Sequence, residues 1–145
     1  MRRDADPTLQ RRHIEKADAA LMAITPPPDA PANAVLDDPG LQAALSGINP
    51  AFGDLCTRVA GEVWGKPLID QATKTLITIV IDVVNQGLVP ESPYEAHIRM
   101  ALKQGVSFEQ IEELLLFTCA YAGFNKLAPA FGRLNEIRQR IESEG

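Results

Sequence analysis

The chain of 145 residues has only two cysteines and two histidines. Cys56 and Cys119 are too few for a disulfide framework, which fits a reducing cytoplasm. His13 and His97 lie 84 positions apart, and neither a His-x-x-x-His nor a Cys-x-x-Cys spacing occurs. The sequence therefore predicts no metal site. A glycine-rich phosphate loop is likewise absent.

Positive charge and long apolar runs are also scarce. Lys and Arg total 14 against 19 Asp and Glu, for a net charge of -5. This leaves no basic stripe for nucleic acid, which is not an expected partner. The most apolar run, Leu76 to Val84, is interrupted by Thr78 and Asp82 and is shorter than the roughly 20 residues of a membrane-spanning helix. No apolar stretch follows the charged N-terminus, so we predict no signal peptide. We expect a soluble, cytoplasmic protein with no membrane partner.

The sequence does have a hydrophobic content of 46%, together with residues that typically begin and end helices. A chain of this length forms one compact domain that buries roughly 70% of its unfolded surface. No segment between turn signals alternates with a period of two for long enough to predict a strand. We therefore predict an all-α fold of about five core helices plus an N-terminal helix. Residues 1–34 form a helical appendage, with apolar spacing from Pro7 to Ile24, and a Pro-rich linker; residues 35–145 form the helical domain.

Helix start signals recur from residue 49 onward. Each joins a capping side chain to a proline or an acceptor side chain in the first turn. They lie at Asn49-Pro50, Ser92-Pro93-Tyr94-Glu95 and Ser107-Phe108-Glu109-Gln110, the last two predicted to form capping boxes. A further helix is predicted over 69–86 and a last one over 125–144. In the last helix, Pro129 fits only in the first turn or at a break.

The predicted helix over 69–86 is apolar on most faces but carries one polar stripe. Steps of four, three, four and three residues align its members: Gln71, Thr75, Thr78, Asp82 and Asn85. The stripe either faces solvent or lines a cavity. If it lines a cavity, Asp82 and Thr78 are the expected polar groups there, because a buried carboxylate needs a partner.

His97 lies at the edge of the apolar side of the predicted helix that begins near Ser92, one turn from Tyr94. A histidine in this position can transfer protons near neutral pH. It can equally be a hydrogen-bonded structural residue, and the pattern alone leaves both interpretations open.

The block "HIRMALKQGVSFEQIEELLLFTCAYAGF", 97–124, resembles the carboxymuconolactone decarboxylase superfamily. Upstream, "IDQATKTLITIV" is similar to that family's Leu-Asp-x-x-x-Arg-Glu-Leu-Ile element, and the resemblance covers roughly 49–137. It implies an all-helical subunit that forms trimers or hexamers. It also implies one of two chemistries, either cofactor-free decarboxylation of a lactone acid or peroxide reduction by the alkylhydroperoxidase D-like branch.

The departures from that pattern disfavour the peroxidase branch. The resemblance places that branch's two cysteines at Pro90 and Pro93, and its relay glutamate at Thr75. Without a thiolate the redox mechanism is excluded. The decarboxylase branch then implies His97 as proton donor. Its other expected pocket residues are Lys74, at the family's Arg position, and Arg99 for an anion, and the hydroxyls of Tyr94 and Tyr121 for a carbonyl, unless these rings pack in the core.

We therefore expect a cofactor-independent lyase acting on a small cyclic or unsaturated carboxylic acid, with His97 as proton donor. The alternatives are a non-catalytic member that binds an apolar ligand, and a divergent cofactor-free isomerase or hydrolase, for which Thr75, Thr78 and Asp82 matter more. We also expect a homo-oligomer, because "LLLFTCAYAGF" and "LITIVIDVV" carry more apolar surface than five helices can hide.

Overall fold

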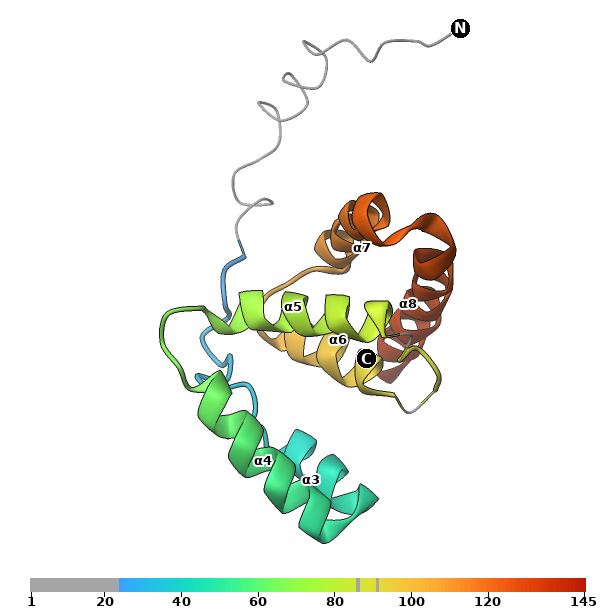
Figure 1. Ribbon diagram of the computed structural model, residues 1–145. Helices are drawn as coiled ribbons and strands as arrows, with labels where there is room; N and C mark the ends of the chain where they lie inside the picture. The colour runs from blue at the N-terminus through green and yellow to red at the C-terminus, as the bar shows by residue number, and fades with distance from the viewer. Residues whose placement is uncertain (1–23, 86, 91) are drawn as a thin grey trace, which may run out of the picture.

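The computed structural model describes residues 24–85, 87–90 and 92–145. Within these residues all regular secondary structure is helical, as predicted, and no strand occurs. The helices are α3 (Pro39–Ile48), α4 (Pro50–Trp64), α5 (Gln71–Val84), α6 (Pro93–Lys103), α7 (Phe108–Ala122) and α8 (Phe124–Glu144) (Figure 1). The predicted helix over 7–24 lies almost wholly outside the described residues. No described helix combines the length and apolar character needed to cross a membrane.

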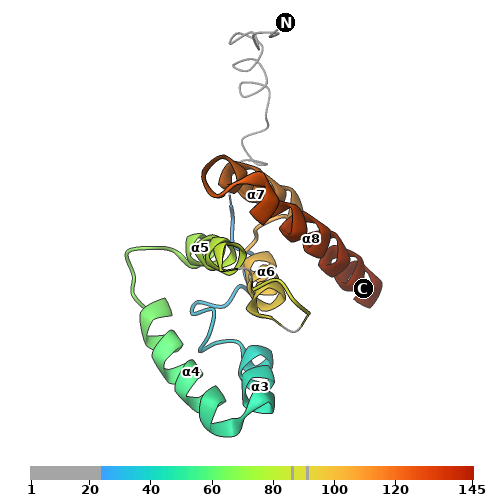
Figure 2. The same ribbon diagram turned by 45° about the vertical axis from the view of Figure 1, so that its right-hand side comes forward.

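The four helices α5 to α8 form the main core. In both views α5 and α6 lie in the middle, with the pair α7 and α8 on one side and the hairpin of α3 and α4 on the other (Figures 1 and 2). The core side chains without exposed surface include Ile79, Val83, Tyr94, Ile98, Ile111, Leu115, Leu127 and Ile137. α5 is thus held against α6, α7 and α8 by its inner face.

The hairpin of α3 and α4 has little core of its own. No residue of α3 is buried. A small cluster of Ala34, Val35, Trp64 and Met100 joins the base of the hairpin to α6. The two helices approach closely at Gly53, where a Cβ would lie 2.6 Å from the backbone nitrogen of Ser46. The rest of the hairpin projects away from the main core (Figure 2).

The structure adds one helix that the sequence did not predict. No helix is predicted between the Pro-rich linker and Asn49, yet α3 begins at Pro39, where the Asp38 carboxylate caps it by accepting from the backbone N–H of Leu41 at 3.0 Å. The predicted capping box at Ser107 and Gln110 is confirmed.

The other predicted capping box, at Ser92 and Glu95, is wrong. The Ser92 side chain makes no capping hydrogen bond, and its buried hydroxyl has no partner among the described residues. The Glu95 carboxylate pairs with three arginines and not with the backbone N–H of Ser92, because a carboxylate binds guanidinium groups more strongly than a neutral backbone N–H.

The prediction for Pro129 also needs correction. α8 begins at Phe124, so Pro129 lies beyond its first turn yet causes no break in the helix. Gly123, with φ of 101°, separates α7 from α8 in a conformation that favours glycine.

Candidate active site

Two side chains from neighbouring helices form the centre of the candidate site. Asp82 of α5 and His97 of α6 meet with Oδ2 2.5 Å from Nδ1. The side chain of Asp82 is 10% exposed and that of His97 is 24% exposed. A carboxylate so poorly solvated needs a hydrogen-bonded partner, and the imidazole provides it. The pair therefore holds the histidine ring in one orientation.

The orientation of the ring decides what His97 can do. An ionised carboxylate only accepts hydrogen bonds, so Nδ1 carries the hydrogen between the two groups. Nε2 has no hydrogen-bond partner among the described residues, although it is not among their buried unpaired atoms. In the neutral ring Nε2 has a free lone pair, and in the imidazolium it has a proton to give. The pair is equipped to carry a proton at Nε2.

The polar stripe of α5 mostly faces its neighbours in the fold, and of its five members only Asn85, at the end, is exposed. Gln71 accepts from the backbone N–H of Ala34 at 2.8 Å and donates to the carbonyl of Trp64 at 2.7 Å, which fastens α5 to the base of the hairpin. Thr75 has no exposed surface and its hydroxyl donates to the carbonyl of Ala72. The stripe is thus largely a contact surface, and Asp82 is the member that meets His97.

A small notch lies beside the stripe, toward the start of α5. It has a volume of about 190 Å³ and is lined by Val63, Trp64, Lys74, Ile77 and Thr78. The ammonium of Lys74 donates to the carbonyls of Trp64 and Lys66 at 2.8 and 2.7 Å. Since an ammonium has three N–H groups, one is left for a ligand. Thr78 lies one helical turn from Asp82 on the same face, so the notch and the dyad share one side of α5.

The two predicted tyrosines occupy opposite environments. Tyr94 has no exposed surface, and its hydroxyl donates to the carbonyl of Ala130 at 3.0 Å. Burial, reinforced by the negative charge of Asp82, raises the pKa of Tyr94 well above its usual value, so the phenol stays protonated. Tyr121 is 82% exposed, and its ring centre lies 5.3 Å from that of Phe117. Among the described residues neither hydroxyl bonds to the dyad, although Tyr94 lies near enough to Asp82 to feel its charge.

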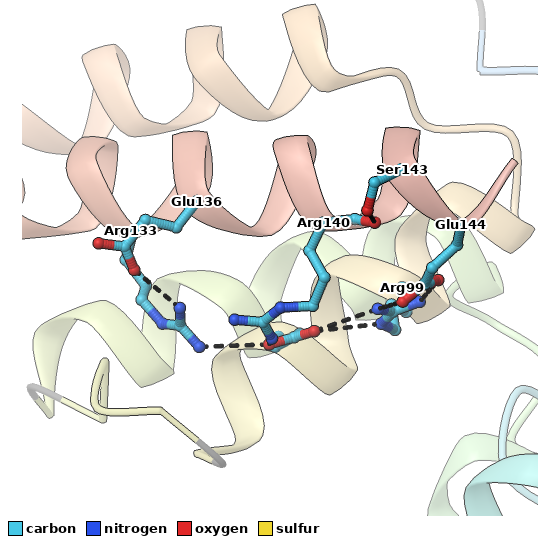
Figure 3. A network of polar contacts seen from close by, with 7 residues as sticks. Arg99, Arg133, Glu136, Arg140, Ser143 and Glu144 are labelled. Carbon is cyan, nitrogen blue, oxygen red and sulfur yellow. Dashed lines mark hydrogen bonds and ion pairs between the residues drawn. The ribbon is translucent and has the colours of Figure 1, made fainter.

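Arg99 points away from the dyad, into an ionic network between α6 and α8. Its guanidinium pairs with Glu144 at 2.9 Å and with Glu95 at 3.2 Å. Glu95 is also bound by Arg133 at 3.2 Å and by Arg140 at 2.5 Å. Figure 3 shows Arg133, Arg140 and Glu144 projecting from α8 toward α6, with Glu144 beside Arg99 and Glu136 beside Arg133. The network fastens the helix that carries His97.

Sequence reasoning did not find the role of Glu95 or Arg133. The side chain of Arg133 is only 7% exposed and bridges Glu95 and Glu136. One local signal was present, the four-residue spacing of Glu95 and Arg99. The contacts across to α8 span 38 to 45 residues of sequence and had no local signal.

The described residues contain no group of three His, Cys, Asp or Glu side chains that could hold a metal ion. What they do contain is a histidine–carboxylate pair on two packed helices of an all-α subunit. An imidazole held by a carboxylate can carry a proton, so this arrangement permits proton transfer by side chains.

Comparison with known proteins specifies the family. The carboxymuconolactone decarboxylase family model matches residues 50–136, and the chain belongs to this family. The chain is 32% identical to a 4-carboxymuconolactone decarboxylase of Acinetobacter baylyi over 94 residues, which cover 64% of this chain and 68% of that protein. No solved structure matches the chain.

Proposed function

We propose that the protein is a cofactor-independent carboxy-lyase that removes carbon dioxide from a small cyclic or unsaturated carboxylic acid. The observation that carries the proposal is the contact between His97 Nδ1 and the Asp82 carboxylate, which leaves Nε2 for the substrate. Kinship with a 4-carboxymuconolactone decarboxylase supports the reaction class, and makes 4-carboxymuconolactone the first substrate to test.

The proposed reaction needs one proton. When the bond to the departing carboxylate breaks, its electrons stay on the substrate and spread into a conjugated carbonyl, which gives an enolate or dienolate. The imidazolium of His97 donates its Nε2 proton to the carbon, and solvent later returns a proton to the ring. Asp82 stabilises the imidazolium and holds the ring in place throughout. The net change is loss of carbon dioxide and gain of one proton, with no cofactor.

Lys74 is our candidate for binding an anionic group of the substrate. Its third N–H has no acceptor among the described residues, and it lines the notch together with Thr78. Eight residues of helix separate Lys74 from Asp82, a rise of about 12 Å that the lysine side chain partly spans. An anchor at this distance binds a group remote from the reacting carboxylate, which leaves that carboxylate free to depart. Arg99 is the weaker candidate, because Glu95 and Glu144 already occupy its guanidinium.

The test is to incubate the purified protein with 4-carboxymuconolactone and related lactone acids, and to measure substrate loss and carbon dioxide release. His97→Gln should fold normally and lose activity by about 10²- to 10⁴-fold, the usual contribution of a positioned acid or base. Arg58→Gln is the matched control, because this exposed arginine lies on α4 and its one ion pair in the described part of the chain is with exposed Asp54. Carbon dioxide release by His97→Gln at the wild-type rate would contradict the role of His97. A folded wild type that binds the acids without converting them would instead support a binding function.

We further propose that the working unit is a homo-oligomer in which a second copy covers the apolar stripes of α4, α5 and α7. Ten large side chains, each between 40% and 82% exposed, form these stripes: Phe52, Leu55, Val59, Val63, Ile77, Ile81, Val84, Leu116, Phe117 and Tyr121. With on the order of 150–200 Å² per side chain, they present about 1,000 Å² of apolar surface. A standard interface takes roughly 800 Å² from each partner. We also propose that the protein works in the cytoplasm.

A further inference from the structure

We propose a second activity for the dyad of Asp82 and His97, namely exchange of a carbon-bound hydrogen of the decarboxylated lactone with solvent. The inference rests on the proposed function for the choice of ligand, and on the geometry of the dyad for the chemistry. Nε2 of His97, which gives a proton to carbon in the proposed decarboxylation, can also remove a proton from carbon.

The geometry makes the dyad reversible. Asp82 Oδ2 lies 2.5 Å from His97 Nδ1, so the hydrogen-bonded nitrogen is committed to the carboxylate in both protonation states of the ring. Nε2 has no partner among the described residues that would compete for its lone pair. The neutral ring is therefore a base with a free lone pair at Nε2, and the imidazolium that it becomes is paired with Asp82. Neither direction of proton transfer requires the ring to turn.

Solvent reaches the ring that carries the proton. The His97 side chain is 24% exposed, against 10% for Asp82. A proton taken from carbon onto Nε2 can thus be replaced by one from water before it returns. A dyad shielded from solvent would instead return the same proton to the carbon, and no exchange would be observed.

Each step balances. Nε2 of neutral His97 takes the acidic hydrogen from the carbon next to the lactone carbonyl, and the electrons of the C–H bond move into an enolate. The imidazolium exchanges its Nε2 proton with solvent and returns the new one to carbon. In deuterium oxide the result is C–H plus D₂O giving C–D plus HDO. If the proton returns to the other end of a conjugated enolate, the double bond shifts position, which is an isomerisation.

The experiment uses the full-length protein and the lactone that remains when 4-carboxymuconolactone loses carbon dioxide. Deuterium uptake in D₂O is followed by proton NMR and mass spectrometry, alongside carbon dioxide release from the acid. We expect uptake at least tenfold above that of an equal concentration of free imidazole. His97→Gln should reduce it to that background, while Asp54→Asn, which alters an exposed carboxylate on α4, should leave it unchanged.

Asp82 is assigned a positioning role and needs a readout of its own. Asp82→Asn should lower both exchange and decarboxylation by the same factor, of about 10² or more, because one proton carrier serves both. Added imidazole should restore exchange in His97→Gly, and should restore it far less in His97→Gly combined with Asp82→Asn. A purely structural role for Asp82 would let imidazole act equally in the two backgrounds, which would overturn the assignment.

The two proposals fail in different ways. Decarboxylation without exchange would overturn the second activity and leave the first in place. Exchange without decarboxylation would remove the lyase and support an isomerase that uses the same dyad. A protein that does neither would overturn both.

Discussion

Replacing the buried hydroxyl of Tyr94 tests whether this residue stabilises the core or acts on the substrate. Tyr94→Phe removes one hydrogen bond of 3.0 Å to the carbonyl of Ala130, and both residues have no exposed surface. A net hydrogen bond contributes about 0.5–1.5 kcal/mol, and burial leaves the abandoned carbonyl without water, so we expect a loss of about 1 to 1.5 kcal/mol in the free energy of unfolding. For a chain of this size the melting temperature should fall by about 3 to 5 °C.

Tyr121→Phe is the matched control, because it removes the same hydroxyl from a ring that is 82% exposed. It should change the free energy of unfolding by less than about 0.5 kcal/mol. Both variants are measured by urea denaturation and by turnover at 25 °C, where Tyr94→Phe should stay within about twofold of wild type. Wild-type stability in Tyr94→Phe together with a tenfold loss of turnover would refute the argument. That outcome would mean that the hydroxyl acts on the substrate, which is the alternative to core packing that the sequence left open for Tyr94.

Local signals were sufficient for most helix starts. The capping side chains of Asn49 and Ser107 bond to backbone N–H groups three residues away, so neither needs anything from the rest of the fold. Asp38-Pro39 is a start signal of the same kind, a capping side chain followed by proline. It follows a Pro-rich linker closely, and the helix that it begins was not predicted. Ser92 shows the limit of such signals, because the expected acceptor, Glu95, is taken by arginines that come from much later in the chain.

The candidate site was predicted in its parts but not in its pairing. His97 stood out at the edge of an apolar face, and Asp82 as the carboxylate of a mostly apolar helix. Their contact depends on how α5 and α6 rotate against each other across the 15 residues that separate the two side chains. No periodicity within either helix contains that rotation. The same reason explains why Tyr94, equally well placed on its helix, proved to be a core residue.

The remaining predictions concern assembly and acid stability. Val59→Asp introduces a charge on the α4 stripe and should shift the protein toward a 15.8 kDa monomer in analytical ultracentrifugation, whereas Arg58→Asp on the adjoining exposed position should keep the wild-type mass; a monomeric wild type would contradict the proposed assembly. The second prediction concerns stability at low pH and the ion pair of 2.6 Å between Lys103 and Asp38. Burial opposes ionisation of Asp38, but hydrogen bonds from Lys103 and the Leu41 amide outweigh it and lower the pKa of Asp38 below its ordinary value of 3.8. A lowered folded-state pKa stabilises the protein above the unfolded-state value, and that contribution is lost as the pH falls through the folded-state value. Lys103→Met should therefore cost about 1 kcal/mol at pH 7, since the lysine is half exposed, and progressively less below pH 3.8. A cost that stays constant down to pH 2 would show that Lys103 stabilises the fold through its packing and not through its charge.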